Sequence, residues 1–200
     1  SSAHRFAPLL SRCTITENHG GGIRLLGGQC TLTSCIVWDN VGEALYLDED
    51  ASAQVSGSCI ESEDVWPEEG NTNEDPGFCG WPVGEVVVGS PAEFAEALGG
   101  FRLALGPDSP LRGAGIGADT GVCETAGAPA LRIQLEPGDY PIDGYSLVHK
   151  VSIEGSGADE TTLRGTVVGL RTGATLSGVT VRDGTRGGIV IRGESPHVVD

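Results

Sequence analysis

The chain has 200 residues, of which 32 are glycine, and its 28 acidic and 12 basic side chains give a formal net charge of −16. So much glycine disfavours a helical bundle and favours an all-β fold with tight turns, because each glycine in a helix costs about 1 kcal/mol relative to alanine. The charge argues against nucleic acid and anionic membranes as partners, since phosphate binding depends on lysine and arginine. Apolar runs are too short for a membrane span of roughly 20 residues, so we expect no membrane insertion.

Residues 1–65 carry a repeat with a period of about 22–24 residues, which lies in the range typical of solenoids. The run from Leu10 to Ile15 has the same form as the run from Leu32 to Val37, and a looser copy contains Cys59, which aligns with Cys35. Two short strands per repeat cannot bury an apolar face alone, so we expect parallel coils stacked about 4.8 Å apart. The side chains expected to point into this stack are those of Leu10, Leu32, Ile23 and Leu45.

Polar side chains recur beside the apolar ones. Asn18, Asn40 and Asp64 each lie five residues after a cysteine. A stacked asparagine at a turn can bond to the backbone of its own coil and of the neighbouring coil. We therefore expect Asn18 and Asn40 to be structural.

The cysteines of this repeat have two interpretations. Cys13, Cys35 and Cys59 recur at one position of the aligned coils, so they could form a ladder of small buried side chains. Alternatively, two of them could form a disulfide between neighbouring coils, because about 4.8 Å is an allowed Cα separation. Three cysteines in one ladder cannot all pair with one another.

An acidic loop follows the third copy. Its oxygen-rich side chains could bind Ca²⁺, which takes six to eight oxygen ligands, but no EF-hand spacing is present and a solvated loop is the favoured interpretation. We therefore expect no cofactor, with Ca²⁺ as the only candidate metal. The candidate ligands are Glu61, Glu63, Asp64, Glu74 and Asp75.

Residues 66–130 contain one predicted helix and one predicted disulfide. The helix covers 91–98, with Ser90 as N-cap and Gly99 as its stop, and its Phe94 and Leu98 should pack on the solenoid. Cys79 and Cys123 flank an irregular segment and are the expected disulfide. An even count of six cysteines in an acidic chain favours an oxidising, extracellular or cell-surface location.

Residues 131–200 return to the repeat. Leu176, Val179 and Val181 have the form of the earlier copies, and Ile189 follows Val179 by ten residues. We expect Val179 and Ile189 to point inward.

Several segments together resemble the right-handed parallel β-helix repeat family, which includes pectate-lyase-like proteins and secreted bacterial surface proteins. The stretch 130–140 resembles the entry strand of such domains and 151–157 the coil that follows. The segments 75–78, 100–103, 108–110 and 116–118 resemble the closing tail. The resemblance implies a right-handed parallel β-helix, and it says little about activity, because one fold hosts many functions.

A catalytic role has few candidates. A polysaccharide lyase or hydrolase needs a carboxylate cluster near a lysine or arginine, or a paired acid and base. The residues that could meet across coils are Asp183, Glu154, Arg182 and Arg192. No catalytic motif is present, so we assign no catalytic residue and expect a structural role.

The parts of the family pattern stand in permuted order. Coils (1–65) and the closing tail with helix and linker (66–130) precede the entry strand and first coils (131–200). The two halves could close on each other in one chain, as a circularly permuted spacer, or the second part of one chain could stack on the first part of another. We expect an extracellular structural subunit that assembles head to tail, with a carbohydrate-binding or carbohydrate-cleaving protein, and hence a glycan partner, as the alternative. The expected assembly interface comprises Phe6, Leu9, Leu10, Ile191 and Val198.

Overall fold

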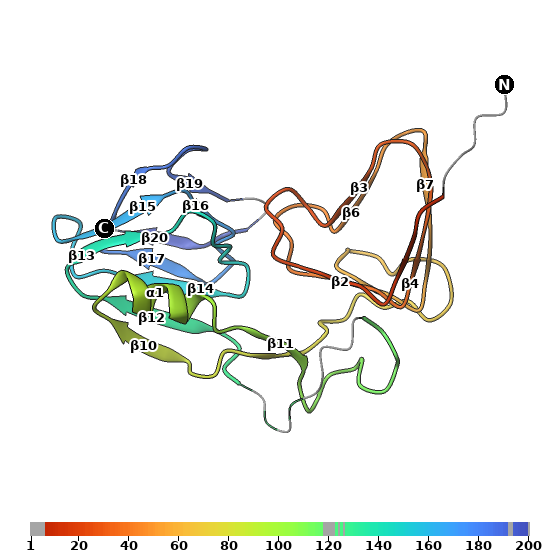
Figure 1. Cartoon of the computed structure of the whole chain (residues 1–200), viewed down its shortest axis with the longest axis horizontal. Coiled ribbons are helices and arrows are strands. Elements are labelled where there is room, and N and C mark those ends of the chain that lie inside the picture. Colours follow the sequence, from red (N-terminus) through yellow and green to blue (C-terminus); the bar gives the residue numbers. More distant parts are fainter. Residues whose placement is uncertain (1–6, 118–122, 124, 126, 192–193, 200) are drawn as a thin grey trace. The chain divides into compact units, whose positions relative to one another are not determined.

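The structure is a computed structural model that describes residues 7–117, 123, 125, 127–191 and 194–199. Its parallel strands are stacked as a β-solenoid of about 8 turns, and about 40% of the chain is strand (Figure 1). The solenoid predicted from the repeat is therefore confirmed. The chain divides into two compact units, unit 1 (1–78 with 104–124) and unit 2 (79–103 with 125–200), which we describe separately.

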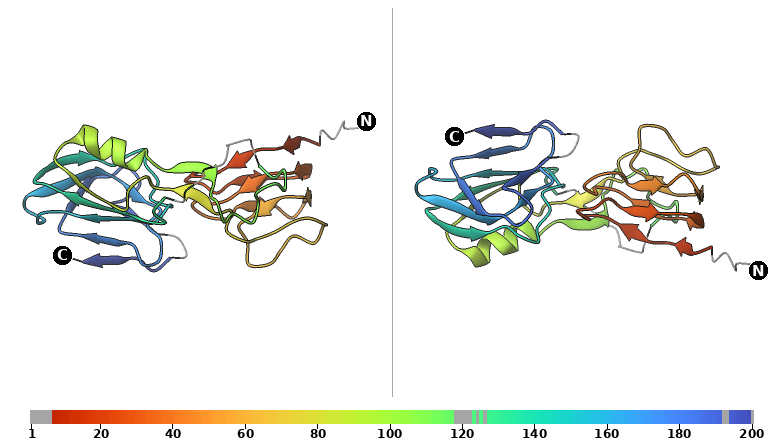
Figure 2. Two further views of the ribbon diagram at one scale, coloured as in Figure 1. Left: turned by 90° about the horizontal axis from the view of Figure 1, so that it is seen from below. Right: turned by 90° about the horizontal axis from the view of Figure 1, so that it is seen from above.

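Unit 1 is built from three parallel sheets. They contain β1 (Leu9–Ser11), β4 (Gly28–Thr33) and β7 (Ala51–Ser56); β2 (Thr14–Ile15), β5 (Ile36–Val37) and β8 (Cys59–Ile60); and β3 (Ile23–Leu25) and β6 (Leu45–Leu47). Figure 2 shows these strands as successive layers. Leu10 pairs with Leu32, so the first and second coils have the predicted alignment.

The third coil departs from the predicted alignment. The repeat aligns Cys59 with Cys35, but in the structure Cys59 pairs with Ile36, so the register is shifted by one residue. Cys59 is therefore outside the cysteine ladder, and the ladder of three cysteines is wrong. Ser58 takes the third position of the ladder. Its hydroxyl donates to the carbonyl of Ser56, two residues earlier, just as the Cys35 thiol donates to the carbonyl of Thr33.

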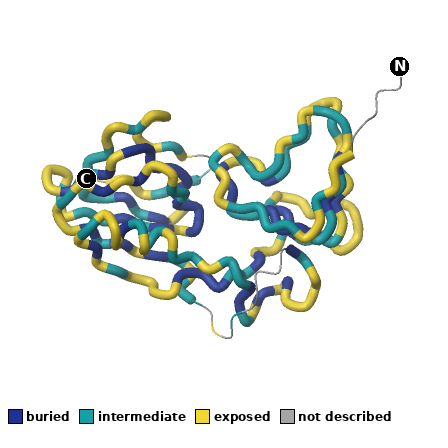
Figure 3. Tube along the Cα trace, viewed as in Figure 1, coloured by how far each residue is buried: buried dark blue, intermediate teal, exposed yellow. Residues whose placement is uncertain are grey.

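The inward positions of unit 1 form its core. Leu32 and Val55 are fully buried, and Leu10, Ile23 and Leu45 pack against them half-buried, as predicted. Figure 3 shows buried residues, in dark blue, in both units.

Asn18 and Asn40 form a hydrogen-bonded ladder at one corner of the coil. The Asn40 Oδ1 accepts bonds from the backbone N–H of Asn18, at 3.1 Å, and from its Nδ2, at 2.9 Å. The Asn40 Nδ2 donates to the carbonyls of Ile15 and Trp38. Both residues are thus structural, as expected, whereas Asp64 is exposed and outside the ladder.

Replacing Asn40 with alanine should destabilise unit 1 by about 2–4 kcal/mol, because buried hydrogen-bonding groups are left without partners. Asn40 is only 3% exposed, and its loss leaves the Asn18 amide and the carbonyls of Ile15 and Trp38 without this partner. Urea unfolding measures the change. Asn73→Ala is the matched control, since the Asn73 side chain bonds two carbonyls at an exposed site. Equal effects of the two variants would contradict a ladder that stabilises the fold.

The closing segment packs on the outer side of unit 1. Leu105 and Leu111 contact Ile36 and Cys59, which lie in β5 and β8. Leu105 ends β11 (Arg102–Leu105), which pairs with β9 (Phe78–Gly80).

Cys79 and Cys123 form a disulfide, as predicted. They lie in segments where the chain passes from one unit to the other.

Unit 2 is also built from three parallel sheets. They contain β10 (Glu85–Val88), β12 (Leu131–Leu135), β14 (Val151–Glu154), β17 (Thr175–Ser177) and β20 (His197–Val199); β13 (Gly138–Pro141), β15 (Thr161–Gly165) and β18 (Thr180–Asp183); and β16 (Val167–Val168) and β19 (Ile189–Val190). The coils are unequal in length. Fewer residues separate Leu131 from its partner Val151 along the chain than separate Ile153 from its partner Leu176.

The helix α1 (Pro91–Leu98) covers the first coil of unit 2. Ser90 caps it through a 3.3 Å bond from the Glu93 amide to the Ser90 hydroxyl, and Gly99 ends it, as predicted. Phe94 is fully buried and meets the ring of Tyr140 edge to face at 5.5 Å between centroids. Leu98 packs on the same core.

The strand β10 precedes the predicted entry strand in the sheet. Its Val86 pairs with Ile133 in β12, so the segment 79–103 belongs to unit 2 and not to a separate tail or linker. The expected division at 65 and 130 therefore differs from the one that the contacts make. Long-range pairing of β10, which the local sequence pattern does not reveal, decides this boundary.

Candidate assembly interface

Unit 2 ends in an apolar surface that no described strand covers. Ile189 pairs with Val167, and Val198 pairs with Leu176, so both occupy inward positions. Val167 and Leu176 are buried, whereas Ile189 is 36% and Val198 48% exposed. We call this surface, formed by β18, β19 and β20, the open end of unit 2.

A carboxylate fastens the last strand to the coil before it. The Glu194 carboxylate accepts bonds from the backbone N–H and hydroxyl of Thr172, at 2.7 and 2.6 Å, and from Arg171 at 2.9 Å. Burial acts to raise the pKa of Glu194, but these hydrogen bonds outweigh it and the pKa is lowered. Glu194 lies three residues before β20 and so positions that strand.

Glu194→Gln should loosen β20. The variant keeps the shape but loses the charge that Arg171 and Thr172 bind, and we expect about 1 kcal/mol less protection of the β20 amides from hydrogen exchange. Because the folded pKa is lowered, the stabilisation is present above the unfolded value of about 4.3 and is lost as the pH falls through the folded pKa. The exposed Glu160→Gln serves as control. Equal protection in the two variants at neutral pH would contradict this role.

Unit 1 has an open end as well. Its first coil consists of β1, β2 and β3, and Leu10, Ile15 and Ile23 are only half-buried there. In the next coil, Leu32 and Val37 are fully buried. We call the surface of this first coil the open end of unit 1.

The opposite ends of both units are covered. In unit 1 the loop after β8 folds back, so that Thr72 pairs with Cys59 and Trp66 packs on the core. In unit 2 the cover is α1 with its buried Phe94. Among the residues that the structure describes, each unit therefore has one closed and one open end.

The two open ends have the same spacing of inward residues. In unit 1, the series Leu10, Ile15, Ile23 and Leu32 advances by five, then eight, then nine positions. In unit 2, the series Leu176, Val181, Ile189 and Val198 advances by the same three steps. Because the inward residues have the same spacing in both units, the two end coils have a matching cross-section.

The predicted interface residues differ in their placement. Val198 and Leu10 lie at inward positions of the open ends, and Ile191 is 41% exposed just after β19. Leu9 is 68% exposed and neighbours the inward Leu10 in β1, so it faces outward. Phe6 lies outside the described residues.

The acidic loop does not gather its carboxylates. Glu61 accepts a bond from the backbone N–H of Asp39 at 2.8 Å, and Asp75 accepts one from that of Gly77 at 2.8 Å. Glu63, Asp64 and Glu74 are exposed. In the described part of the chain, no three His, Cys, Asp or Glu side chains converge as metal ligands.

The candidate lyase residues lie on different sheets. Arg182 and Asp183 belong to a surface ion-pair network in which Arg164 and Arg182 each bind Asp139 at 3.0 Å. A hydrogen bond from Arg164 is the main reason that the pKa of Asp139 is lowered. Glu154 instead pairs with Arg132, at 3.7 Å in the β12–β14 sheet, and Arg192 lies outside the described residues. These groups bind each other across coils, and no acid–base pair is formed among those described.

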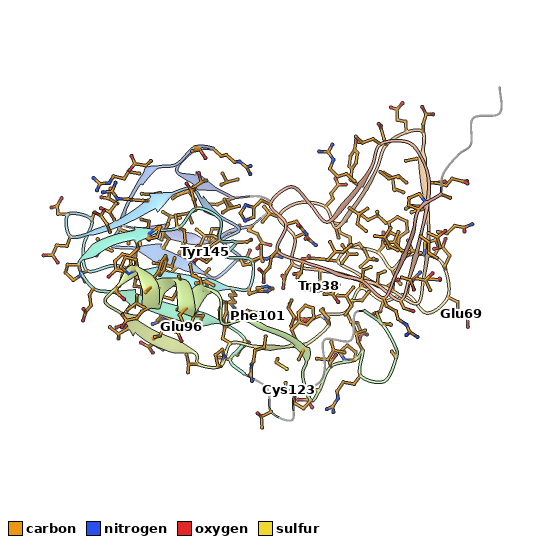
Figure 4. The ribbon with its side chains drawn as sticks, in the orientation of Figure 1. Trp38, Glu69, Glu96, Phe101, Cys123 and Tyr145 are labelled. Atoms are coloured by element: carbon orange, nitrogen blue, oxygen red, sulfur yellow. The ribbon has the colours of Figure 1, made fainter. Side chains whose placement is uncertain are left out.

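A groove that the sequence did not reveal runs between α1 and the edge strand β10. Its volume is about 340 Å³, and its lining is mostly apolar, with Val83, Val86, Val87 and Trp81 on one side and Ala97 on the other. Glu93 and Glu96 stand on the helix side, and Figure 4 labels Glu96 on α1. Its lining residues include no nucleophile–base pair.

Comparisons with known proteins add no identity: no family model, no curated protein and no solved structure matches the chain. Among the described residues, no helix is both long and apolar enough to cross a bilayer.

Proposed function

We propose that this protein is a secreted structural subunit that assembles head to tail through its solenoid ends. The open end of unit 2 in one copy stacks on the open end of unit 1 in the next copy. The matching spacing of inward residues at the two ends is the observation that carries the proposal.

The strand order gives the junction a direction. Unit 1 runs from its open end at β1 towards its closed end, and unit 2 runs from α1 towards its open end at β20. Stacking β1 on β20 therefore keeps all strands parallel, and the sheet ending in β17 and β20 continues as β1, β4 and β7. β18 and β19 lie one layer deeper than β20. The junction therefore consists mainly of the pairing between β20 and β1.

Burial and backbone pairing both favour the junction. It would bury Val198 against Leu10, with roughly 25 cal/mol gained for each Å² of apolar surface removed from water. It would also pair the free backbone edge of β20 with that of β1, and unpaired edges are templates for such contacts. Because the two surfaces differ, the contact is head to tail and passes from copy to copy, which generates filaments when the rotation between copies does not close a ring.

The cellular setting follows from two features. The segments that resemble the right-handed parallel β-helix repeat family support membership of a group with many secreted proteins. The disulfide between Cys79 and Cys123 favours an oxidising location. We therefore place the assembly outside the cell or at its surface.

Sedimentation velocity over a wide concentration range tests the proposal, with electron microscopy of the same samples. We expect sedimentation coefficients that rise with concentration and filaments at the highest concentrations. A monomer at every concentration would overturn it and would favour a chain whose own two units stack on each other.

A further inference from the structure

Cys13 and Cys35 occupy the same position in neighbouring coils of unit 1. The residues that follow the two cysteines, Thr14 and Ile36, are paired in the parallel sheet. The Ile36 amide donates to the Cys13 carbonyl at 2.8 Å. The residues before them, Arg12 and Ser34, both have positive φ, of 54° and 56°. The two coils therefore make the same turn and present the two cysteines in the same direction.

The two sulfur atoms point to equivalent places. The Cys13 thiol lies 3.5 Å from the Ser11 carbonyl, and the Cys35 thiol lies 3.4 Å from the carbonyl of Thr33, the partner of Ser11. The Cys35 sulfur also lies 3.6 Å from the carbonyl of Leu10, in the coil that contains Cys13. In-register neighbours in a parallel sheet are about 4.8 Å apart, and a disulfide accepts Cα separations of roughly 4.4–6.8 Å.

The remaining cysteines of unit 1 do not compete for this pairing. The third position of the ladder is Ser58, which cannot form a disulfide. Cys59 is fully buried, and its thiol lies 3.3 Å from the Glu74 carbonyl. Cys30 pairs with Ala53 in another sheet. The ladder thus offers one pair of thiols.

We propose that Cys13 and Cys35, which are thiols in this structure, are a site of oxidative modification and form a second disulfide that ties the first coil to the second. The disulfide links equivalent positions of two successive coils and fastens the coil that forms the open end of unit 1. It does not depend on whether that end binds another copy.

The reaction is a thiol–disulfide exchange with a small oxidised disulfide such as oxidised glutathione. The thiolate of Cys13, which is half-buried and the more accessible of the two, attacks one sulfur of the reagent and releases one thiol. Cys35 then loses its proton to solvent, and its thiolate attacks the Cys13 sulfur and releases the second thiol. Two cysteine thiols are oxidised and one reagent disulfide is reduced to two thiols.

Burial sets the rate of the second step. It raises the pKa of Cys35, so its thiolate is scarce at neutral pH. The intramolecular step should therefore accelerate as the pH rises, and the mixed disulfide on Cys13 should accumulate briefly.

The experiment equilibrates the folded full-length protein with oxidised and reduced glutathione, blocks free thiols under denaturing conditions, and maps a non-reduced digest by mass spectrometry. We expect a peptide linked through Cys13 and Cys35, beside the linked Cys79 and Cys123, with Cys30 and Cys59 blocked as thiols. We also expect oxidation to raise the melting temperature.

Two variants separate this pairing from its alternatives. Cys59→Ser should leave the new crosslink unchanged, whereas Cys13→Ser should remove both the crosslink and the rise in melting temperature. Circular dichroism confirms that both variants are folded. The proposal is overturned if Cys13 and Cys35 stay reduced at oxidising glutathione ratios, if either links to Cys59, or if Cys13 keeps glutathione and never pairs with Cys35.

Discussion

Val198→Asp should abolish assembly while leaving both units folded. Val198 is 48% exposed, so an aspartate there remains solvated in the free subunit. In the proposed junction the same carboxylate would be buried against Leu10 with no partner, and burying an unpaired charge costs several kcal/mol. We expect sedimentation velocity to give a single monomeric species at concentrations at which the unmodified protein forms filaments.

Val65→Asp is the matched control for this variant. Val65 is a valine of similar exposure, 50%, and it lies in the loop after β8, away from the open end. The control should assemble normally. If Val198→Asp assembled as well as the unmodified protein, β20 would not be part of the junction. Leu10→Asp tests the other side, although Leu10 also packs on the core and its loss should lower the stability of unit 1.

Phe94→Ala should lower the free energy of unfolding of unit 2 by about 3–5 kcal/mol, the usual cost of truncating a buried phenylalanine. Phe94 is fully buried between α1 and the first coil, where it meets Tyr140 edge to face. Its removal forfeits the burial of a large aromatic side chain and leaves a cavity beneath the helix. Faster hydrogen exchange in β12 and β14 would report the loss within unit 2.

Glu96→Ala is the control on the same helix. Glu96 is exposed, and alanine is the better helix former, so the change should stay within about 0.5 kcal/mol. If Phe94→Ala were no more damaging than Glu96→Ala, α1 would not be the cover of the solenoid. Filament formation by Phe94→Ala at low temperature should be retained, because the open end lies at the other side of unit 2.

The fold of unit 1 could be predicted from the sequence because its coils are nearly equal in length. One period places Leu10 beside Leu32 and Asn18 beside Asn40, and identical side chains at stacked positions make that period visible. The third copy is shifted by one residue, and the matching of Cys59 to Cys35 followed residue type instead of backbone register. One residue of error changes which side chain occupies each position of the coil.

The helix and the disulfide were also predicted from local signals. Ser90, Pro91 and Gly99 mark the ends of α1 by their own backbone preferences, which need no tertiary contact. The sequence predicts the pairing of Cys79 with Cys123 because the two flank an irregular segment, and the structure joins them.

The sequence by itself determined the parallel coils, the inward residues and the helix. The helix is marked by residues at its own ends, and the coils and their inward residues are marked by the match between one coil and the next. Only the tertiary structure decided that β10 opens unit 2 and that α1 covers it, because Val86 pairs with Ile133 across a long segment that contains no repeat. It also decided that Ser58, and not Cys59, continues the cysteine ladder, which leaves Cys13 and Cys35 as a pair. The physical reason is the same in both cases: strand register is set by hydrogen bonds and packing between coils, and neither is encoded in the spacing along one coil.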